Sequence, residues 1–468
     1  MSVSVSVSVV LRRSARRSSG VACLVLTSVL AASRAPVSAQ AVTPRPLGAD
    51  LPVFRPPADA ARQITNPAGQ LTLRDALAVA LLQSPELAAY AWEIRARESR
   101  TLQAARPPNP VFSAVVEDLG SGTPNGLTES LIQPQTTLQL SQLVELGGKR
   151  TARRNLAQLN RDLAEWDYEL ARIDVFTRVS GAFINVLASQ EAVALSNQTM
   201  QLVEQTQETV RARVTAGVVS PIEQTKAEVA LASARIDSDR ARRTLEADKR
   251  RLAALWGAAD AAFEAATGDL TVLPTVPAFD ALQARLAESP ELARWATEIS
   301  QRQAALALER ARRVPDLTLS AGYRRFTQID SNAFLVGGSI PLPLFDRNSA
   351  GIQEAADRSS KAAEEQRAAQ VRANTALADA YRALASARDE VAALSSSVLP
   401  GARATFEAVS EGYRLGKFGY LEVLDAQRTL VAASGQYQRA LSDFHKAAAE
   451  MERLTGAPLG GPGRSSIK

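Results

Sequence analysis

The chain has 468 residues, a formal net charge of +5 and only 5% aromatic residues. Long stretches rich in Ala, Leu, Gln, Glu and Arg predict long helices rather than a conventional globular core. With one cysteine, Cys23, and one histidine, His445, the composition excludes a disulfide framework and a dense transition-metal site. No metal site and no cofactor are therefore expected, and His445 is predicted to lie on a solvated helix face.

Residues 1–39 have the layout of a secretory signal peptide. Four arginines precede an apolar run over residues 21–32, and small residues follow just before Ala39. Cleavage after Ala39 would remove Cys23 and five arginines but no acid, so the mature chain would be formally neutral. The basic pI therefore does not indicate nucleic-acid binding. Lipidation of Cys23 is an alternative, although most of the apolar run follows that residue.

The remaining chain has no apolar run close to the ~18 residues that suggest a membrane-spanning helix. An exported chain of this kind is expected to be periplasmic, secreted or an outer-membrane barrel. Proline-rich residues 40–70 predict an extended strap, and residues 455–468 predict a disordered tail.

The sequence SPELA occurs twice, beginning at Ser84 and at Ser289. Each motif lies within a helical pattern, over residues 73–106 and 282–313, that runs into a strand-like segment, PNPVFSA or PDLTLSA. Serine followed by proline and an acid is a strong helix-start arrangement, so both serines are predicted to be N-caps.

The repeat extends well beyond these motifs. Residues 217–228 align with residues 416–427, sharing a glycine, an aliphatic residue followed by Glu, and a later alanine. We therefore divide the chain into two copies of one unit, 71–257 and 281–454, joined by a linker at 258–280.

Each copy is predicted to contain a helix, a strand pair, a very long helix, a turn and a further helix. Residues 149–214 contain no proline and only one glycine. Their apolar positions step by three and four, as in a heptad seam: Leu156, Leu159, Leu163, Trp166, Leu170 and Ile173. Such a helix would be roughly 100 Å long and must pack lengthwise against others.

Four short segments predict strands, with a polar loop at 120–134 in the first copy. The predicted strands cover residues 111–117, 136–143, 317–324 and 334–342. Four strands cannot close a membrane barrel, for which about eight are the minimum. Either several chains share one barrel, or two soluble hairpins cap a helical bundle.

This arrangement resembles the TolC-like outer-membrane efflux proteins over about residues 71–454. The likeness rests on the duplicated unit, the twin SPEL helix starts, SQLVELGGKR leaving the first hairpin and GYRLGKFGYLEVLDAQRTL in the second copy. VELGGKR is most similar to the heavy-metal, cobalt-zinc-cadmium branch. The resemblance implies a mainly α fold with a small β part: a homotrimer whose 12-stranded outer-membrane β-barrel continues into a 12-helix periplasmic α-barrel.

The resemblance also implies a function. Such channels dock with a periplasmic adaptor and an inner-membrane RND-type pump and export the cargo, here expected to be heavy-metal cations. Drugs or other organic compounds are an alternative cargo, and a soluble periplasmic coiled-coil scaffold or adaptor is an alternative function. No nucleophile–base pair, metal cluster or phosphate loop is found, so no enzyme activity is expected.

In the resembled family the periplasmic constriction lies at the turns around Gly217 and Gly416. Second-copy turns often carry two acids three residues apart, which are Glu422 and Asp425 in this chain, and Glu223 aligns with Glu422. Three chains would gather these acids around one axis and favour cations. Alternatively, Glu223 and Glu422 are ordinary first-turn acids, with Asp425 paired to the arginine one turn on.

Tyr413 matches a tyrosine that members of the family use in closing the tunnel. Five residues later this chain has Phe418, where some relatives have a basic residue, so an inter-helix salt bridge from that position is not expected. Packing of an aromatic residue at a turn is the alternative role for Tyr413.

Gly147, Gly148, Lys149 and Arg150 are predicted to form the junction between barrel and tunnel. The two glycines suggest a flexible exit, and the two cations are expected to face lipid headgroups at the start of a helix. Positive charge opposes the helix dipole there, so an outside anion would compensate it. A solvated first turn is the alternative.

Overall fold

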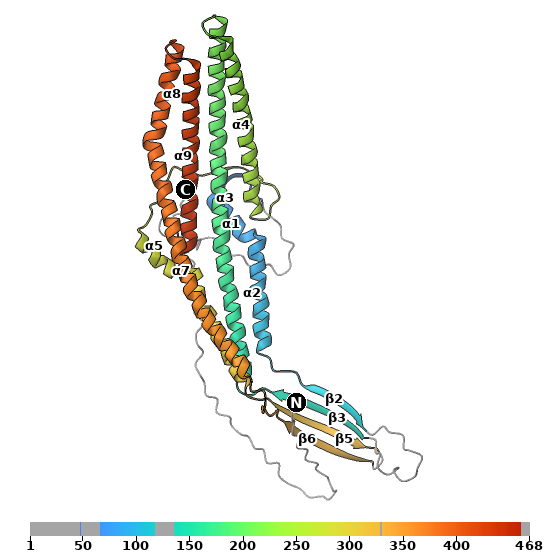
Figure 1. Cartoon of the computed structure of the whole chain (residues 1–468). Coiled ribbons are helices and arrows are strands. Elements are labelled where there is room, and N and C mark those ends of the chain that lie inside the picture. Colours follow the sequence, from blue (N-terminus) through green and yellow to red (C-terminus); the bar gives the residue numbers. More distant parts are fainter. Residues whose placement is uncertain (1–46, 48–65, 118–134, 328–329, 460–468) are drawn as a thin grey trace. The chain divides into compact units, whose positions relative to one another are not determined.

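The computed structural model describes Leu47 and residues 66–117, 135–327 and 330–459. The predicted signal peptide with Cys23, most of the strap, the first-copy polar loop and the last nine residues lie outside these residues. The first copy contains β1 (Gly69–Thr72), α1 (Leu73–Gln83), α2 (Pro85–Ala104), β2 (Val111–Glu117), β3 (Gln135–Val144), α3 (Lys149–Thr215) and α4 (Pro221–Ala254) (Figure 1).

The second copy repeats this order, preceded by one linker strand. The elements are β4 (Phe263–Thr267), α5 (Phe279–Ala287), α6 (Pro290–Arg312), β5 (Leu317–Phe326), β6 (Ser331–Ser339), α7 (Ser349–Ala393), the π-helical turn η1 (Leu394–Val398), α8 (Leu399–Arg414) and α9 (Tyr420–Thr455). The strands that pair in hairpins lie within three residues of their predicted bounds.

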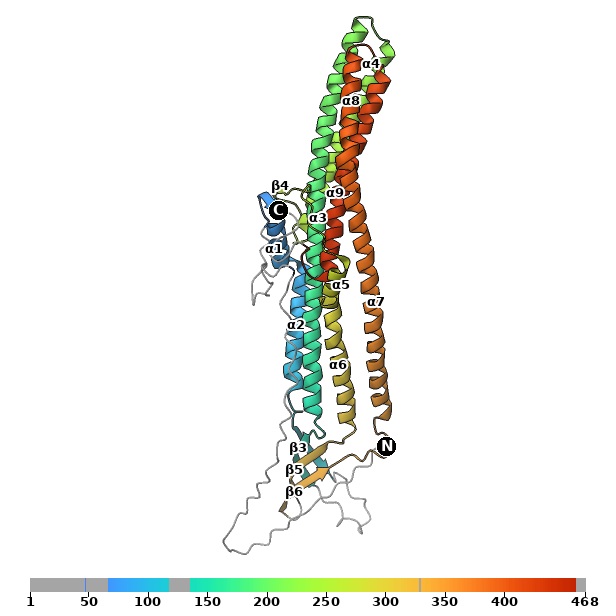
Figure 2. The ribbon, with the colours of Figure 1, turned by 90° about the vertical axis from the view of Figure 1, so that its left-hand side faces the viewer.

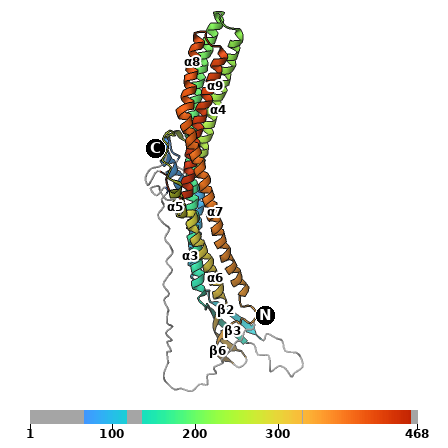
Figure 3. The ribbon, with the colours of Figure 1, turned by 60° about the vertical axis from the view of Figure 1, so that its left-hand side comes forward.

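The described residues form two compact units. The sheet unit comprises residues 96–162 and 297–363, and the helical unit comprises Leu47 with residues 66–95, 163–296 and 364–459. In the helical unit, α3 with α4 and α8 with α9 form two hairpins whose turns lie at the same end (Figures 2 and 3). None of the helices that the structure describes combines the length and apolar character needed to cross a membrane.

The sheet unit contains one antiparallel sheet in the order β2-β3-β5-β6. Paired residues of neighbouring strands share a face. One face is mostly apolar: Phe112, Ala114, Val116, Leu138, Leu140, Leu319, Ala321, Tyr323, Phe334 and Val336. The other is mostly polar, and in it Arg324 donates to Thr137 and pairs with Glu117. The sheet is therefore amphipathic, with an apolar face that contains strongly exposed side chains.

A second, two-stranded sheet was not predicted. β1 pairs in parallel with β4, which lies in the segment expected to be a linker. Gln190 of α3 covers β4: its amide donates to the Ala266 carbonyl at 2.9 Å and accepts from the Ala266 N–H at 2.7 Å. A side chain thus supplies the pair of hydrogen bonds that a further strand would make.

The two SPELA motifs start new helices, as predicted: α2 begins at Pro85 and α6 at Pro290, so each of the helical patterns over 73–106 and 282–313 comprises two helices. At Ser84, α1 ends and α2 begins, and the Ser84 hydroxyl accepts a long 3.4 Å bond from Leu87 N–H. The buried Ser289 hydroxyl has no hydrogen-bond partner among the described residues, and the carbonyl of Ser289 accepts from Leu292 and Ala293 instead. Side-chain capping is therefore weak in the first copy and absent in the second.

Both motifs border one cavity of about 500 Å³ in the helical unit. Glu86 of the first motif and Glu291 of the second line it together with Arg453 of α9. Glu86 forms an ion pair with Arg178 of α3, which also contacts Asp174 at 3.0 Å. The acid of the first motif therefore pairs with a cation of α3, and the acid of the second lines the same cavity as Arg453.

The long helix of the first copy is uninterrupted, whereas its second-copy counterpart is broken. α3 has 67 residues, and the corresponding stretch comprises α7, η1 and α8 with 45, 5 and 16 residues. Pro400 lacks the N–H that would bond the Ser396 carbonyl, which accounts for a π-helical turn just before it. The Ser396 hydroxyl donates to the Ala392 carbonyl at 2.7 Å within this turn.

The prediction that residues 455–459 are disordered is wrong, because they form the ordered end of α9 and the segment after it. Gly456 ends the helix in the left-handed region at φ 67°. Leu459 is only 3% exposed, and its N–H donates to Glu452 Oε1 at 3.0 Å. The Pro458 carbonyl accepts from Arg285. This segment therefore packs as part of the helical core.

Burial raises the pKa of Glu452 from its ordinary 4.5 to about 7, although the bond from Leu459 N–H opposes the shift. The folded state therefore binds this proton more tightly than the unfolded state, so the free energy of unfolding falls between pH 4.5 and about pH 7. Glu452→Gln should raise it by up to about 3 kcal/mol at pH 8 and leave it unchanged at pH 4. Denaturant unfolding at both pH values measures this difference.

Glu450→Gln is the matched control, because Glu450 pairs with Arg453 at 2.7 Å and its substitution removes a favourable contact. The control is expected to lower stability slightly at pH 8. An equal effect of Glu452→Gln at pH 4 and pH 8 would contradict the raised pKa.

Candidate functional site

The two turns that align in the sequence have the same backbone structure. Gly217 follows the end of α3 and Gly416 follows the end of α8, with φ angles of 71° and 76°. In each turn the glycine N–H bonds the carbonyl three residues back, and the next N–H bonds the carbonyl five residues back. These paired bonds are a Schellman motif, which needs a left-handed residue and so favours glycine.

A small apolar cluster lies beneath the two turns and joins the hairpins. Its buried members are Val210 of α3, Ala227 of α4, Tyr413 of α8, and Tyr420 and Val423 of α9. Tyr413 is 3% exposed and its ring lies 6.3 Å from that of Tyr420. Tyr413 therefore packs within this cluster and also makes polar contacts, while its role in closing the tunnel stays a prediction.

Arg213 holds Tyr413 from the opposite hairpin. Its guanidinium lies over the Tyr413 ring, 4.4 Å from the centroid, and also donates to the Tyr413 carbonyl. The Tyr413 hydroxyl donates to Glu223 Oε2 at 3.4 Å. Burial is the main cause that raises the pKa of Tyr413, followed by the Glu223 charge, while Arg213 opposes the shift. Tyr413 thus stays a neutral donor between one cation and one anion.

Of the four predicted gate residues, the structure brings Glu223 and Tyr413 together. Glu422 and Asp425 are exposed in the first turns of α9, and Glu422 lies back over Gly419. Sequence reasoning missed Arg213 as the partner of Tyr413. Some relatives have a basic residue where this chain has Phe418, and its absence was a signal to look for a cation elsewhere near Tyr413. Phe418 packs over Gly412.

The predicted junction residues lie between β3 and α3 in the sheet unit. Gly147 and Gly148 both have left-handed φ angles, 68° and 73°. At Gly147 a Cβ atom would lie 2.7 Å from Val314 Cβ, whereas at Gly148 it would meet nothing within 4 Å. Gly147 is therefore required both by its backbone and by the close approach of Val314, so the exit from the sheet is fitted rather than flexible.

The expectation that a lipid headgroup or another outside anion compensates Lys149 is wrong. Its ammonium lies 2.7 Å from Asp316 Oδ1, just before β5, and its side chain is only 11% exposed. The same oxygen accepts from Leu146 N–H at 3.0 Å. The anion that offsets positive charge at this helix start is thus the protein's own carboxylate, while Arg150 is exposed.

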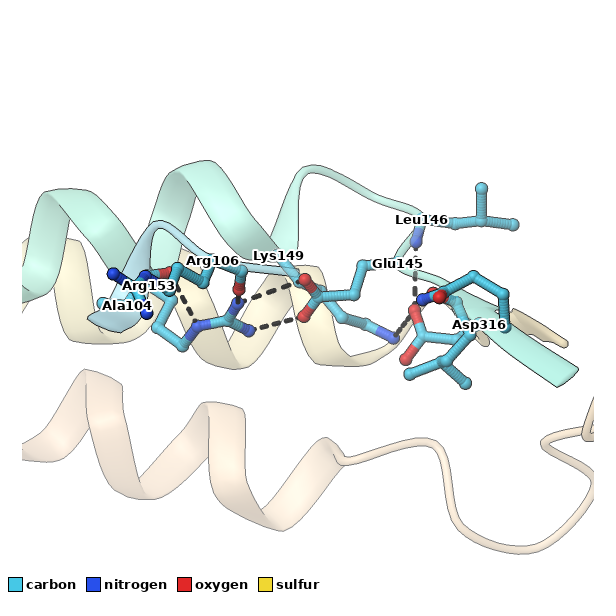
Figure 4. A network of polar contacts seen from close by, with 9 residues as sticks. Ala104, Arg106, Glu145, Leu146, Lys149, Arg153 and Asp316 are labelled. Atoms are coloured by element: carbon cyan, nitrogen blue, oxygen red, sulfur yellow. Dashed lines mark hydrogen bonds and ion pairs between the residues drawn. The ribbon is translucent and has the colours of Figure 1, made fainter. Parts of the chain in front are cut away.

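Arg153 of α3 completes the junction (Figure 4). It forms a two-bond contact with Glu145, at 2.5 and 3.1 Å, and donates to the carbonyls of Ala104 and Arg106. The hydrogen bond to Glu145 is the main cause that raises the pKa of Arg153. One side chain therefore ties the end of α2 to the β3–α3 link.

His445 is not on a solvated face, which corrects that prediction. It is 2% exposed, and its Nε2 lies 2.9 Å from the Leu270 carbonyl. Burial lowers its pKa, so the ring is held neutral with the proton placed on Nε2 as the donor. Within the described residues, no group of three or more His, Cys, Asp or Glu side chains could hold a metal ion.

The chain matches the model of the outer membrane efflux protein family over residues 76–258 and 281–457. It is 37% identical to the cobalt-zinc-cadmium resistance protein CzcC of Cupriavidus metallidurans, covering 83% of this chain and 91% of that protein. It is 28% identical to the nickel-cobalt-cadmium resistance protein NccC of Alcaligenes xylosoxydans xylosoxydans, covering 67% and 68%. Among solved structures it is similar to CusC, with a TM-score of 0.71 and 18% identity over 87% of this chain and 99% of that one.

Proposed function

The chain belongs to the outer membrane efflux protein family, and from this premise we propose that it is the outer-membrane channel of a tripartite efflux system that exports heavy-metal cations. In this proposal residues 1–39 direct export. Three copies form the conduit, which docks with a periplasmic adaptor and an inner-membrane RND-type pump. No catalytic role and no cofactor are proposed.

The observation that carries the membrane assignment is the amphipathic sheet. Its apolar face exposes Phe112, Phe334 and Val336 by 66%, 70% and 68%. Exposed apolar side chains gathered on one face mark a contact with lipid or protein. A lipid bilayer would cover this face, and the polar face would line water. The alternative of soluble hairpins leaves the apolar face in water without an explanation.

The free edges of the sheet support assembly from several copies. β2 and β6 each have one neighbour, and unpaired backbone groups cannot face lipid. A barrel requires about eight strands or more, and one chain gives four to this sheet. Three copies supply enough strands to remove every edge.

Metal cations are the cargo favoured by the relatives, whose names refer to cobalt, zinc, cadmium and nickel resistance. The chain's own contribution is proposed to lie at the turns, where Glu422 and Asp425 are exposed. Threefold repetition of these acids would favour passage of cations over anions. Glu223 is proposed to act differently, by holding Tyr413. Gly147, Gly148, Lys149 and Arg150 are proposed to join the barrel to the tunnel.

Single-channel recordings of the detergent-extracted protein in planar bilayers test this proposal. Wild type should give discrete pores with cation preference, and Glu422→Gln/Asp425→Asn should lower the cation-to-anion permeability ratio about threefold, because acid rings set selectivity in narrow pores. The control Glu407→Gln/Asp389→Asn removes two exposed acids of α8 and α7 and should change the ratio little.

Pores with the same selectivity in all three proteins would support the channel but would contradict the proposed role of Glu422 and Asp425. A protein that forms no pores and stays in solution without detergent would instead favour the periplasmic scaffold.

A further inference from the structure

We infer that strand β6 of one copy pairs with strand β2 of the next in a single register, which the internal repeat specifies. This inference rests on the proposed assembly of several copies into one barrel. It adds the residues that meet across each subunit boundary, and the known in-chain contact between β3 and β5 serves as the template.

The hairpin registers fix which residues of the two copies are equivalent. PNPVFSA and PDLTLSA align Val111 with Thr318, at the starts of β2 and β5. Val111 pairs with Ser141 of β3, and Thr318 pairs with Ser339 of β6. Ser141 and Ser339 therefore occupy equivalent positions, so β3 and β6 can be superposed residue by residue.

The in-chain boundary between the copies then predicts the boundary between subunits. In the β3–β5 pair, Ser141 lies opposite Ser320. The equivalent of Ser320 in the first copy is Ser113. Ser339 should therefore lie opposite Ser113 of the partner subunit.

A second pair follows from the same equivalence. Leu138 lies opposite Tyr323 in the β3–β5 pair. Their equivalents are Val336 and Val116, so Val336 should lie opposite Val116 of the partner subunit.

The faces of the sheet are consistent with this register and exclude a slip by one residue. Val336 and Val116 both lie on the apolar face, and Ser339 and Ser113 both lie on the mostly polar face. A slip by one residue would place Ser339 opposite Phe112 or Ala114 and would exchange the two faces at every subunit boundary. The inferred register therefore lets the apolar face continue around the closed barrel.

The same equivalence extends past the strands and accounts for Phe345. This residue is 86% exposed in the link between β6 and α7. Its first-copy equivalent is Gly147, which lies against Val314. The first-copy equivalent of Val314 is Pro107, which is exposed. Phe345 is thus expected to be covered by Pro107 of the partner subunit.

Cysteine cross-linking in the assembled full chain tests the register, because the sequence contains no cysteine after Cys23. Directly opposed strand residues have Cα atoms about 4.5–5.5 Å apart, within the range that a disulfide spans. Within one chain, the edge strands are three strand spacings apart, roughly 14 Å, which is too far. Ser339→Cys/Ser113→Cys should therefore link subunits into a covalent ring on mild oxidation.

Two matched pairs serve as controls. Ser339→Cys/Val111→Cys places the thiols on the same face but one pair out of register, and Ser339→Cys/Ala114→Cys places them on opposite faces. Each should give at least about tenfold less linked product than Ser339→Cys/Ser113→Cys, because the thiols cannot reach disulfide geometry. Val336→Cys/Val116→Cys is a second test pair and should also link efficiently.

The oligomer is measured separately, from the mass of the detergent-extracted protein before oxidation. If the protein is trimeric but a control pair links better than both test pairs, or neither test pair links, the inferred register is wrong. The proposed channel would not be affected by either result. A monomeric mass without links would overturn the register together with the proposed assembly.

Discussion

Replacing Arg213 by alanine is expected to raise the open probability of the resting channel at least about tenfold, which corresponds to about 1.4 kcal/mol. Arg213 both stacks on the Tyr413 ring and donates to its carbonyl, and so joins the α3–α4 hairpin to the α8–α9 turn. A desolvated cation–π contact contributes about 2 kcal/mol and a charged hydrogen bond about 1.5–3 kcal/mol. The prediction assumes that this contact is made in the closed state and lost on opening, in which case even half of this sum would shift a two-state gate by the expected amount. Single-channel recording at low voltage measures it.

Arg211→Ala is the matched control for this prediction. Arg211 lies two residues earlier on the same helix, is exposed, and carries the same charge. Its removal should leave the open probability near that of wild type. Arg213→Lys keeps the charge but loses the planar stack, so an intermediate value is expected. If Arg211→Ala and Arg213→Ala opened the channel equally, net charge rather than the Tyr413 contact would set the gate.

Tyr413→Phe tests the contact between the Tyr413 hydroxyl and Glu223 separately from the contact with Arg213. It keeps the ring beneath Arg213 and removes only the 3.4 Å bond to Glu223. A bond of that length is weak, so the expected change in open probability is less than about threefold.

The fold was predictable because its main signals are local and repeated. Heptad spacing in α3 and alternation in β3 and β5 depend on neighbours a few residues apart, and the duplication supplied the helix-start and strand signals twice. The positive φ at Gly217 and Gly416 also follows from local chemistry, since a helix end that turns back favours glycine. The resemblance to the family, rather than this local chemistry, located the constriction at these turns, and that location stays a prediction.

The contacts of the site were less accessible to sequence reasoning. Arg213 and Tyr413 are 200 residues apart in the chain, and neither helix pattern indicates which cation faces which ring. His445 lies in a polar-looking stretch, LSDFHKAAAEME, and its burial and its contact with the Leu270 carbonyl, 175 residues away in the chain, are set by tertiary packing. Lys149 was interpreted from its own helix, whereas its partner Asp316 belongs to the second copy.

The repeat contained an unused clue to that last contact. Asp316 aligns with Asn109, a difference in charge at an otherwise similar strand entry. Asp316 pairs with Lys149 at the boundary between the two copies within one chain. Asn109 occupies the equivalent position next to β2, a strand with a free edge. The two copies thus differ in charge at this position.

Gly147→Ala should lower the free energy of unfolding by about 2–5 kcal/mol, because it combines two costs. An alanine at a left-handed φ costs about 1–2 kcal/mol. The added Cβ would also lie 2.7 Å from Val314 Cβ and 3.1 Å from the Ala311 carbonyl, and overpacking of this kind costs about 1–3 kcal/mol. Denaturant unfolding of the detergent-extracted protein measures the loss, with the amount of folded protein in the outer membrane as a second readout.

Gly148→Ala separates the two costs, because Gly148 has nearly the same φ but its Cβ would meet nothing within 4 Å. It should lose only the backbone part, about 1–2 kcal/mol. Adding Val314→Gly to Gly147→Ala removes the Val314 Cβ that the new alanine would meet. The double variant should therefore lose less free energy of unfolding than the sum of the losses in the two single variants. Equal losses at Gly147 and Gly148, with no coupling to Val314, would show that backbone conformation alone requires the glycines. The larger loss at Gly147 would show that α3 is positioned by close contact with the residues that lead into β5.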